Sequence, residues 1–301
     1  MRTLTAAEIG VVFQPIVDVS KGTLFAHEVL VRCKRPEYAS PPHLFARAVE
    51  ENACGRLGRL IRDVAFATSG AHPLFVNIHP DELSSRWLVR PDDPIGFHCR
   101  PVFLEITESA TFTHFELCRD VLRELCRRTG AALVVDDFGA GHSNLERVVS
   151  LEPAVVKLDL ALVRGVHGDT RKQIVIRHLV RLCGELGATV VAEGVETIEE
   201  LACVRDLGVA FAQGYLLARP AAPPPEFTWP LAGASGAAGS RSLSRPASRR
   251  KLPAVPPPLP TKGRAPPAPS ARRTSKSPPS GGGGARSVGR LSQKPTARPP
   301  R

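Results

Sequence analysis

Residues 131–145 read AALVVDDFGAGHSNL, and the rest of the chain is organised around this stretch. Its first five residues are apolar and include two valines, which is typical of a short buried β-strand. We expect that strand to end on the adjacent carboxylates Asp136 and Asp137, before a turn with two glycines and a helix capped by Ser143 or Asn144. Two neighbouring carboxylates repel each other, and a cation between them would offset this cost. Taken alone, such a pair is more often a solvated turn, so the other strands must decide.

Strand-like and helix-like segments alternate over the first 220 residues. Strands 11–18, which Pro15 interrupts, and 24–32 are joined by a turn too short for a crossover helix, so they must be antiparallel. Six more strands are expected at 74–78, 102–106, 131–135, 154–159, 189–194 and 209–214, and helices at 42–53, 55–69, 81–88, 113–128, 171–186 and 197–207. This alternation predicts an α/β fold, a TIM-like (β/α)8 barrel with an antiparallel first strand. An open doubly wound sheet is the alternative, but no Gly-x-Gly-x-x-Gly turn supports it.

The composition divides the chain near residue 230. Residues 231–301 hold 15 of the 40 Lys and Arg residues and no Asp or Glu, so the net charge of +11 belongs to this segment. It is rich in Pro, Arg, Ser and Gly and cannot bury enough apolar area to fold alone, so we expect one domain at 1–230 and a disordered basic tail at 231–301.

The seven cysteines are odd in number and form no Cys-x-x-Cys, which suggests a reducing compartment. We expect a cytoplasmic protein without a membrane partner, because no signal-like N-terminus or membrane-length apolar run is present.

Polar side chains recur near the ends of the expected strands. These residues are Glu28, Arg32, Asn77, Glu105, Asp136, Asp137, Lys157, Asp159, Glu193 and Gln213. Each has a plain explanation as a solvated group, but seven strands that bring such groups to one barrel rim are hard to explain in that way. Five carboxylates and one Asn form an all-oxygen set that suits Mg²⁺ or Mn²⁺, and their combined charge suggests two ions. A zinc peptidase site is disfavoured because no His lies at ligand spacing in these strand ends.

Such a site suits the hydrolysis of a phosphodiester. Two divalent ions bind the anionic diester, lower the pKa of a bridging water and stabilise its in-line attack. Lys157 could orient that water or neutralise developing charge, and Glu193 could accept its proton.

Eight segments, taken in order, resemble the motif series of the EAL-domain family. They are residues 13–18, 28–32, 75–77, 104–109, 136–139, 156–159, 192–196 and 213–215. The resemblance covers about residues 10–220. It implies a barrel whose first strand is antiparallel and a bacterial signalling phosphodiesterase that opens cyclic di-GMP to linear 5′-pGpG.

The resemblance also implies roles for individual residues. One ion would be held by Glu28, Asn77, Glu105 and Asp136, and a second by Asp136, Asp137 and Glu193. Lys157 would contact the catalytic water and Glu193 would act as base. Substrate-binding residues would be Gln14, Leu30, Arg32, Asp159 and Gln213, the last of which also supports the site by hydrogen bonding.

Two further carboxylates, Glu108 and Glu196, are expected to support the loop 138–145. In the family this loop couples the metal site to a dimer interface, so the resemblance implies a homodimer. Each of these carboxylates is equally explained as a favourable charge in the first turn of a helix.

Two positions depart from the family pattern. Val29 replaces the Ala of the motif that names the family, and strand alternation turns it away from Glu28, so it should alter packing and not ligation. His142 occupies a position that is commonly Tyr, which we interpret as a simple substitution.

Two other functions stay open. A non-catalytic cyclic di-GMP receptor is the first, although receptors of this kind have lost metal ligands and no expected ligand is missing here. The second is a tail that binds nucleic acid or an acidic partner through its positive charge, as opposed to a merely solubilising extension.

Overall fold

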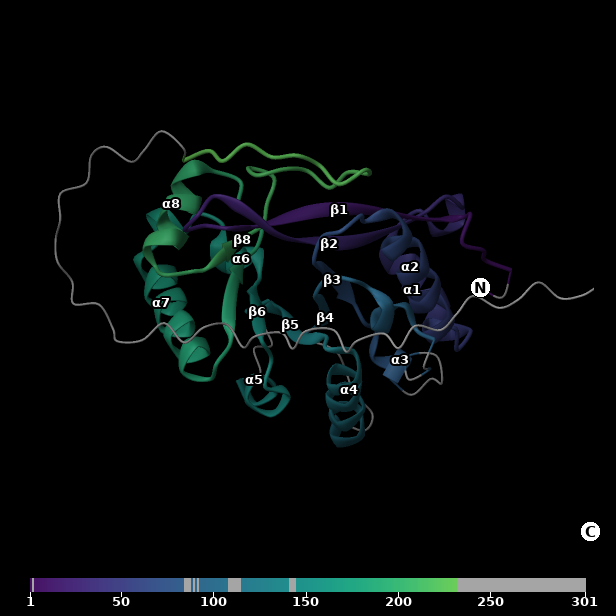
Figure 1. The fold of residues 1–301 in the computed structure, drawn as a ribbon. Coiled ribbons are helices and arrows are strands. Elements are labelled where there is room, and N and C mark those ends of the chain that lie inside the picture. The colour runs from purple at the N-terminus through teal and green to yellow at the C-terminus, as the bar shows by residue number, and fades with distance from the viewer. Residues whose placement is uncertain are drawn as a thin grey trace, which may run out of the picture. The chain divides into compact units, whose positions relative to one another are not determined.

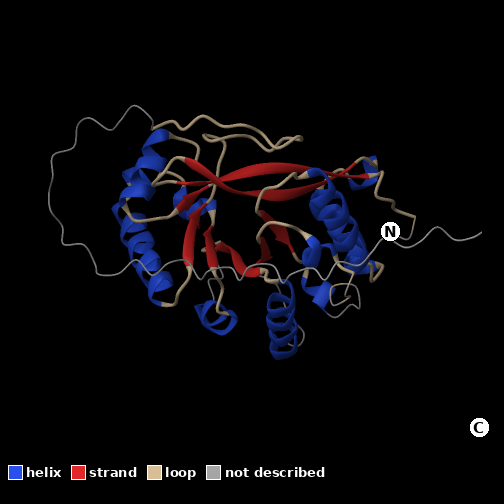
Figure 2. Cartoon of the chain, in the orientation of Figure 1, coloured by secondary structure: helices blue, strands red, loops and turns tan. Residues whose placement is uncertain are grey.

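The structure is a computed structural model that describes residues 1, 3–83, 88, 90, 92–107, 115–140 and 145–231. Eight strands close into a barrel in sequence order, and helices surround them (Figure 1, Figure 2). The strands are β1 (Ile9–Asp18), β2 (Thr23–Cys33), β3 (Leu74–Asn77), β4 (Val102–Thr107), β5 (Ala132–Phe138), β6 (Val155–Leu158), β7 (Thr189–Ala192) and β8 (Phe211–Ala212). The α-helices are α1 (Pro41–Glu50), α2 (Cys54–Thr68), α3 (Pro80–Leu83), α4 (Phe115–Thr129), α5 (Leu145–Leu151), α6 (Leu160–Val163), α7 (Thr170–Glu185) and α8 (Ile198–Asp206). Short 3-10 helices are η1 (Pro36–Tyr38), η2 (Pro94–Phe97) and η3 (Val166–Gly168).

Strand β1 is antiparallel to both of its neighbours, β2 and β8, and the remaining pairs are parallel. This confirms the predicted TIM-like barrel with an antiparallel first strand. The predicted interruption at Pro15 is wrong, because β1 runs through it in register with His27. The His27 amide donates to Pro73 O at 3.0 Å and not to Pro15. The Pro15–His27 pair therefore does not depend on the N–H group that proline lacks. The register shifts instead between Ile16 and Val17.

The central carboxylates lie inside strand β5, not after it. Between Val135 and Phe138 the pairing with β6 shifts, since Val135 pairs with Val156 and Phe138 with Leu158. One extra residue therefore bulges from β5. Asp137 takes a left-handed conformation with φ of 57°, which Asp tolerates better than most residues.

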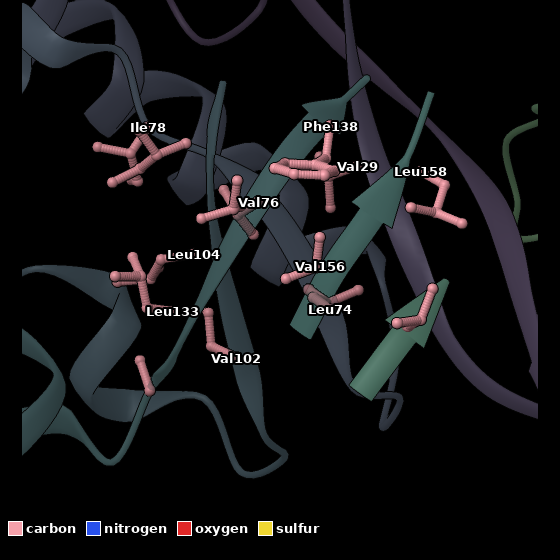
Figure 3. Close-up of a cluster of buried hydrophobic side chains, with 14 of the residues drawn as sticks. Val29, Leu74, Val76, Ile78, Val102, Leu104, Leu133, Phe138, Val156 and Leu158 are labelled. Carbon is pink, nitrogen blue, oxygen red and sulfur yellow. The ribbon is translucent and has the colours of Figure 1, made fainter. Parts of the chain in front are cut away.

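Two apolar layers follow from the alternation of side chains along the strands. The inner layer takes one residue from each strand: Ile16, Ala26, Phe75, Phe103, Val134, Val155, Val191 and Phe211. The outer layer packs between the strands and the helices, and Figure 3 shows Val76, Leu104, Leu133 and Val156 within it. The barrel interior is thus plugged by side chains at the level of this inner layer.

Helix starts follow local capping chemistry. Asp169 accepts hydrogen bonds from the amides of Arg171 and Lys172 at 2.9 and 3.1 Å at the start of α7. Thr197 and Glu200 form a capping box at the start of α8. Helices α1 and α2 lie on one side of the strands and α7 and α8 on the other (Figure 1).

Several expectations fall outside the described residues. These are Glu108, His142, the proposed caps Ser143 and Asn144, and all of the tail after Leu231. Most predicted bounds differ from the observed ones by one to three residues; the predicted last strand, 209–214, is reduced to two residues, Phe211–Ala212. Within the described ranges, no helix combines the length and the apolar character that crossing a bilayer requires.

Candidate metal centre at the barrel rim

The site residues continue the inner rows of the strands. Each lies two positions beyond an apolar residue of the inner layer: Glu28 after Ala26, Asn77 after Phe75, Glu105 after Phe103, Asp136 after Val134, Lys157 after Val155, Glu193 after Val191 and Gln213 after Phe211. In β1 the order is reversed, so that Gln14 precedes Ile16, because this strand runs in the opposite direction. Strand alternation therefore places all eight polar side chains in one layer above the apolar plug.

The bulge in β5 adds a ninth group to this layer. Phe138 packs in the outer core, although simple alternation after Asp136 would turn it inward. The extra residue thus allows two successive carboxylates, Asp136 and Asp137, to face the same rim.

Lys157 lies at the centre of the carboxylates and is 1 % exposed. Its Nζ is 2.6 Å from Glu193 Oε1, 2.7 Å from Glu105 Oε1 and 3.1 Å from Asp136 Oδ1. A fourth carboxylate, Glu28, stands 3.7 Å away. One ammonium group therefore faces four carboxylates, and the cluster keeps an excess of negative charge.

Burial and the crowding of carboxylates shift the pKa values of the site. Burial raises the pKa of Glu105 well above its usual range and that of Glu193 to about 8, although Lys157 counteracts both. Burial and the adjacent Asp136 raise the pKa of Asp137 to about 6. Burial alone would lower the pKa of Lys157, but Glu105, Glu193 and the other carboxylates raise it well above its usual value. The lysine is thus charged, and the carboxylates lack further positive charge.

The carboxylates form two triads that share one residue. Ligand oxygens of Glu28, Glu105 and Asp136 lie within 4.8 Å of one another, as do those of Asp136, Asp137 and Glu193. Glu105 Oε1 and Asp136 Oδ1 are buried and accept no hydrogen bond within the described part of the chain, although both contact the ammonium of Lys157. Oxygen ligands and an excess of negative charge together fit hard divalent cations.

Amide side chains orient two of these carboxylates. Asn77 Nδ2 donates to Glu105 Oε2 at 3.0 Å. Gln213 Nε2 donates to Glu28 Oε2 and, at 2.9 Å, to Gln14 Oε1. Gln14 Nε2 in turn donates to Ala218 O at 3.2 Å, which ties the segment after β8 to the rim.

The remaining predicted residues make their contacts outside the two triads. Leu30 is half-buried, and Arg32 is exposed with its guanidinium donating to Val31 O at 2.8 Å. Asp159 caps α6 by accepting from the Ala161 amide at 2.8 Å. Glu196 is exposed and pairs with Arg164 at 3.0 Å.

One buried ionic cluster was missed by the sequence analysis. The guanidinium of Arg62, which is fully buried, contacts Glu82 Oε2 at 2.7 Å and Asp93 Oδ2 at 2.9 Å. Glu82 Oε1 also accepts from the His79 amide at 3.1 Å, so the cluster holds the segment that follows Asn77. The available signal was a charged residue on the buried face of α2, one turn after Gly58.

Comparisons with known proteins agree with this geometry. The model of the EAL domain family matches residues 1–220. The cyclic di-GMP phosphodiesterase RocR of Pseudomonas aeruginosa is 34% identical over 73% of this chain and 59% of its own length. The cyclic di-GMP phosphodiesterase PdeR of Escherichia coli is 29% identical over 73% of this chain and 35% of its own length.

A solved structure shares the fold. Klebsiella pneumoniae BlrP1, in a calcium and cyclic di-GMP complex, aligns with a TM-score of 0.61 and 34% identity over 71% of this chain and 56% of that one. Its manganese and cyclic di-GMP complex gives a TM-score of 0.60 with the same identity and coverage. The chain thus spans little more than half of BlrP1 and of RocR, and about a third of PdeR.

Proposed function

Because the chain belongs to the EAL domain family, we propose that it hydrolyses cyclic di-GMP to linear 5′-pGpG with the help of divalent cations. The observation that carries the proposal is the pair of carboxylate triads that share Asp136 around the buried Lys157. The names of RocR and PdeR as cyclic di-GMP phosphodiesterases support the choice of substrate.

The ligand sets follow from the two triads. Glu28, Glu105 and Asp136, with Asn77 beside them, would hold one Mg²⁺ or Mn²⁺, and Asp136, Asp137 and Glu193 a second. When bound, such ions neutralise the diester oxygens and lower the pKa of a coordinated water. Their charge also compensates the excess of carboxylates that Lys157 alone leaves unbalanced.

The chain's own groups would handle the proton and the substrate. Glu193 accepts a proton only when ionised, and Lys157 at 2.6 Å favours that ionised form against the effect of burial. The ammonium of Lys157 would also contact the attacking water. Recognition of the dinucleotide would fall to Gln14, Leu30, Arg32, Asp159 and Gln213, with Arg32 giving charge-assisted hydrogen bonds to phosphate.

A turnover assay on the full chain tests the proposal. With cyclic di-GMP and Mn²⁺ or Mg²⁺, we expect linear dinucleotide, and we expect none in a chelator. Glu193→Gln should remove turnover and keep ligand binding, whereas Glu199→Gln, an exposed carboxylate of α8, serves as the matched control. Tight binding of cyclic di-GMP without product by the parent chain would favour the receptor function instead.

We also propose a homodimer formed through α4 and α5. Leu117 on α4 and Leu145 and Val149 on α5 are 63 %, 48 % and 58 % exposed. Arg123 of α4 reaches Glu152 at 2.7 Å beyond the end of α5, so the two helices are neighbours. In the sequence, residues 138–145 connect Asp137 to α5, and Glu108 and Glu196 are the carboxylates proposed to support this loop. Sedimentation should show that Val149→Asp dissociates the dimer, while Leu186→Asp, equally apolar and 45 % exposed on α7's C-terminus, leaves it intact.

The cellular compartment and the function of the C-terminal tail are separate proposals. All seven cysteines are free, which fits a reducing cytoplasm.

A basic tail at 231–301 would bind nucleic acid or an acidic partner through counterion release. If deletion of residues 231–301 leaves retention on DNA at low salt unchanged, the nucleic-acid function of the tail is discarded.

A further inference from the structure

A second group of metal-ligating side chains lies outside the carboxylate triads. Cys54 begins α2, His79 lies in the link between β3 and α3, and Asp81 belongs to α3. One ligand atom from each of the three lies within 4.8 Å of the other two. We propose that Cys54, His79 and Asp81 form a binding site for a zinc ion, distinct from the oxygen-ligated centre at the rim.

The donor types distinguish the two centres. Thiolate and imidazole with one carboxylate form a borderline-soft set that selects zinc over Mg²⁺ or Mn²⁺, whereas the rim offers oxygen ligands alone. Around a tetrahedral zinc ion with bonds of about 2.0–2.3 Å, neighbouring ligand atoms stand about 3.5 Å apart. The three ligand atoms, which lie within 4.8 Å of one another, are therefore close to this spacing.

The orientation of His79 is already fixed. Its ring stacks nearly parallel to that of Phe45 on α1, with an interplanar angle of 10° and centroids 5.8 Å apart. The Asp81 amide donates to His79 Nδ1 at 3.2 Å, and Asp81 Oδ2 stands 3.9 Å from the same nitrogen. Because Nδ1 accepts the Asp81 amide proton, a zinc ion bound at Nδ1 would replace this hydrogen bond, and the stacking against Phe45 would keep the ring in place.

The cluster is closed on one side and open on the other. Cys54 is 3 % exposed, while the side chains of His79 and Asp81 are 27 % and 54 % exposed. Three protein ligands with an open side leave a fourth position to water, as in accessible zinc sites. Burial and the carboxylates of Asp81 and Glu82 raise the pKa of Cys54 to about 12, so binding converts the thiol to a zinc-bound thiolate and releases one proton to solvent.

The position of the site gives it a consequence for the rim. His79 follows Asn77, the amide that orients Glu105, by two residues. A zinc ion there would join the start of α2 to the segment after Asn77, which Glu82 already ties to Arg62. The site would thus fix the β3 end of the oxygen-ligated centre.

Cobalt(II) is the probe that separates the two centres, because only sulfur ligation gives a thiolate-to-cobalt charge-transfer band. The full reduced chain, freed of metal and then saturated with Mg²⁺ to fill the rim, is titrated with Co²⁺ and followed by absorption. We expect a thiolate band that saturates at about one equivalent and disappears when Zn²⁺ is added. The readout does not depend on hydrolysis, so it stands or fails separately from the proposed activity.

Variants then identify the ligands. Cys54→Ala should abolish the band, and Cys183→Ala, which truncates a thiol equally buried at 3 % exposure in α7, should keep it. His79→Gln and Asp81→Asn should each weaken Co²⁺ binding at least about tenfold. Both alter partly exposed side chains, so they test the ligand assignment even if Cys54→Ala does not fold. The proposal is overturned if the parent chain gives no thiolate band at stoichiometric Co²⁺, or if the band survives in Cys54→Ala or is unchanged in both His79→Gln and Asp81→Asn.

Discussion

Replacement of Gly58 by alanine should destabilise the barrel by breaking the buried Arg62 cluster. Gly58 lies inside α2, and a Cβ built there would overlap the carboxylate of Glu82. In an unhindered helix the change from Gly to Ala gains about 1 kcal/mol. Here the displaced carboxylate is 1 % exposed and pairs with Arg62 at 2.7 Å. Loss of one partner of a buried pair costs about 3–5 kcal/mol, so the net loss is about 2–4 kcal/mol.

Thermal unfolding of the full chain measures this loss. For a domain of this size about 2–4 °C of Tm corresponds to 1 kcal/mol, so Gly58→Ala should lower Tm by about 5–15 °C. The matched control is Gly184→Ala in helix α7, where an added Cβ meets no described atom within 4 Å. That variant should melt at or slightly above the parent temperature.

A double-mutant cycle tests the cause. In a Glu82→Ala background the added methyl has no carboxylate to displace, so Gly58→Ala should show an interaction energy of about 1–3 kcal/mol with Glu82→Ala. If Gly58→Ala and Gly184→Ala melt within about 2 °C of each other, steric displacement of Glu82 is refuted.

Three further outcomes concern the rim. Lys157→Met should reduce turnover by at least about 100-fold, and unchanged turnover would contradict the role of the ammonium. The same substitution should lower Tm more in a chelator than in Mn²⁺, because the carboxylates then depend on the metal for positive charge. Gly214→Ala would drive a Cβ into the backbone of Val195 and displace the adjacent Gln213, so circular dichroism should show a lower Tm than in the parent, and an equal Tm would show that the backbone yields. Burial raises the pKa of Glu193 to about 8, so the metal-free folded chain keeps a proton that the unfolded chain releases above about pH 4.5. This difference in proton binding contributes to the free energy of unfolding, and the contribution is lost as pH rises through 8. In a chelator, Glu193→Gln should therefore gain Tm relative to the parent from pH 5 to pH 8, and a difference that stays constant over this range would count against the raised pKa.

Much of the site could be predicted because strand periodicity is local. The two-residue alternation that puts Phe75 and Asn77 or Phe103 and Glu105 on one face is written in the sequence, and the barrel only brings the rows together. The antiparallel first strand was predictable for a similar reason, since the link between β1 and β2 is too short for a helix.

Other features depend on distant residues, and no local pattern reports them. The burial of Arg62 is decided by Glu82 and Asp93, which come from separate elements, and the meeting of Cys54 with His79 requires the start of α2 to pack against the β3–α3 link. The bulge at Asp137 is another case, because two valines followed by two aspartates predict a strand that stops.

The sequence by itself determined which side chains are ionisable and, where strand alternation holds, which face of each strand they occupy, since alternation is a property of the extended chain. Only the tertiary structure decided that the ammonium of Lys157 lies among four carboxylates and that Asp137 joins Asp136 at the rim. The physical reason is that electrostatic energy depends on distances between strands, and closure of the barrel alone sets those distances.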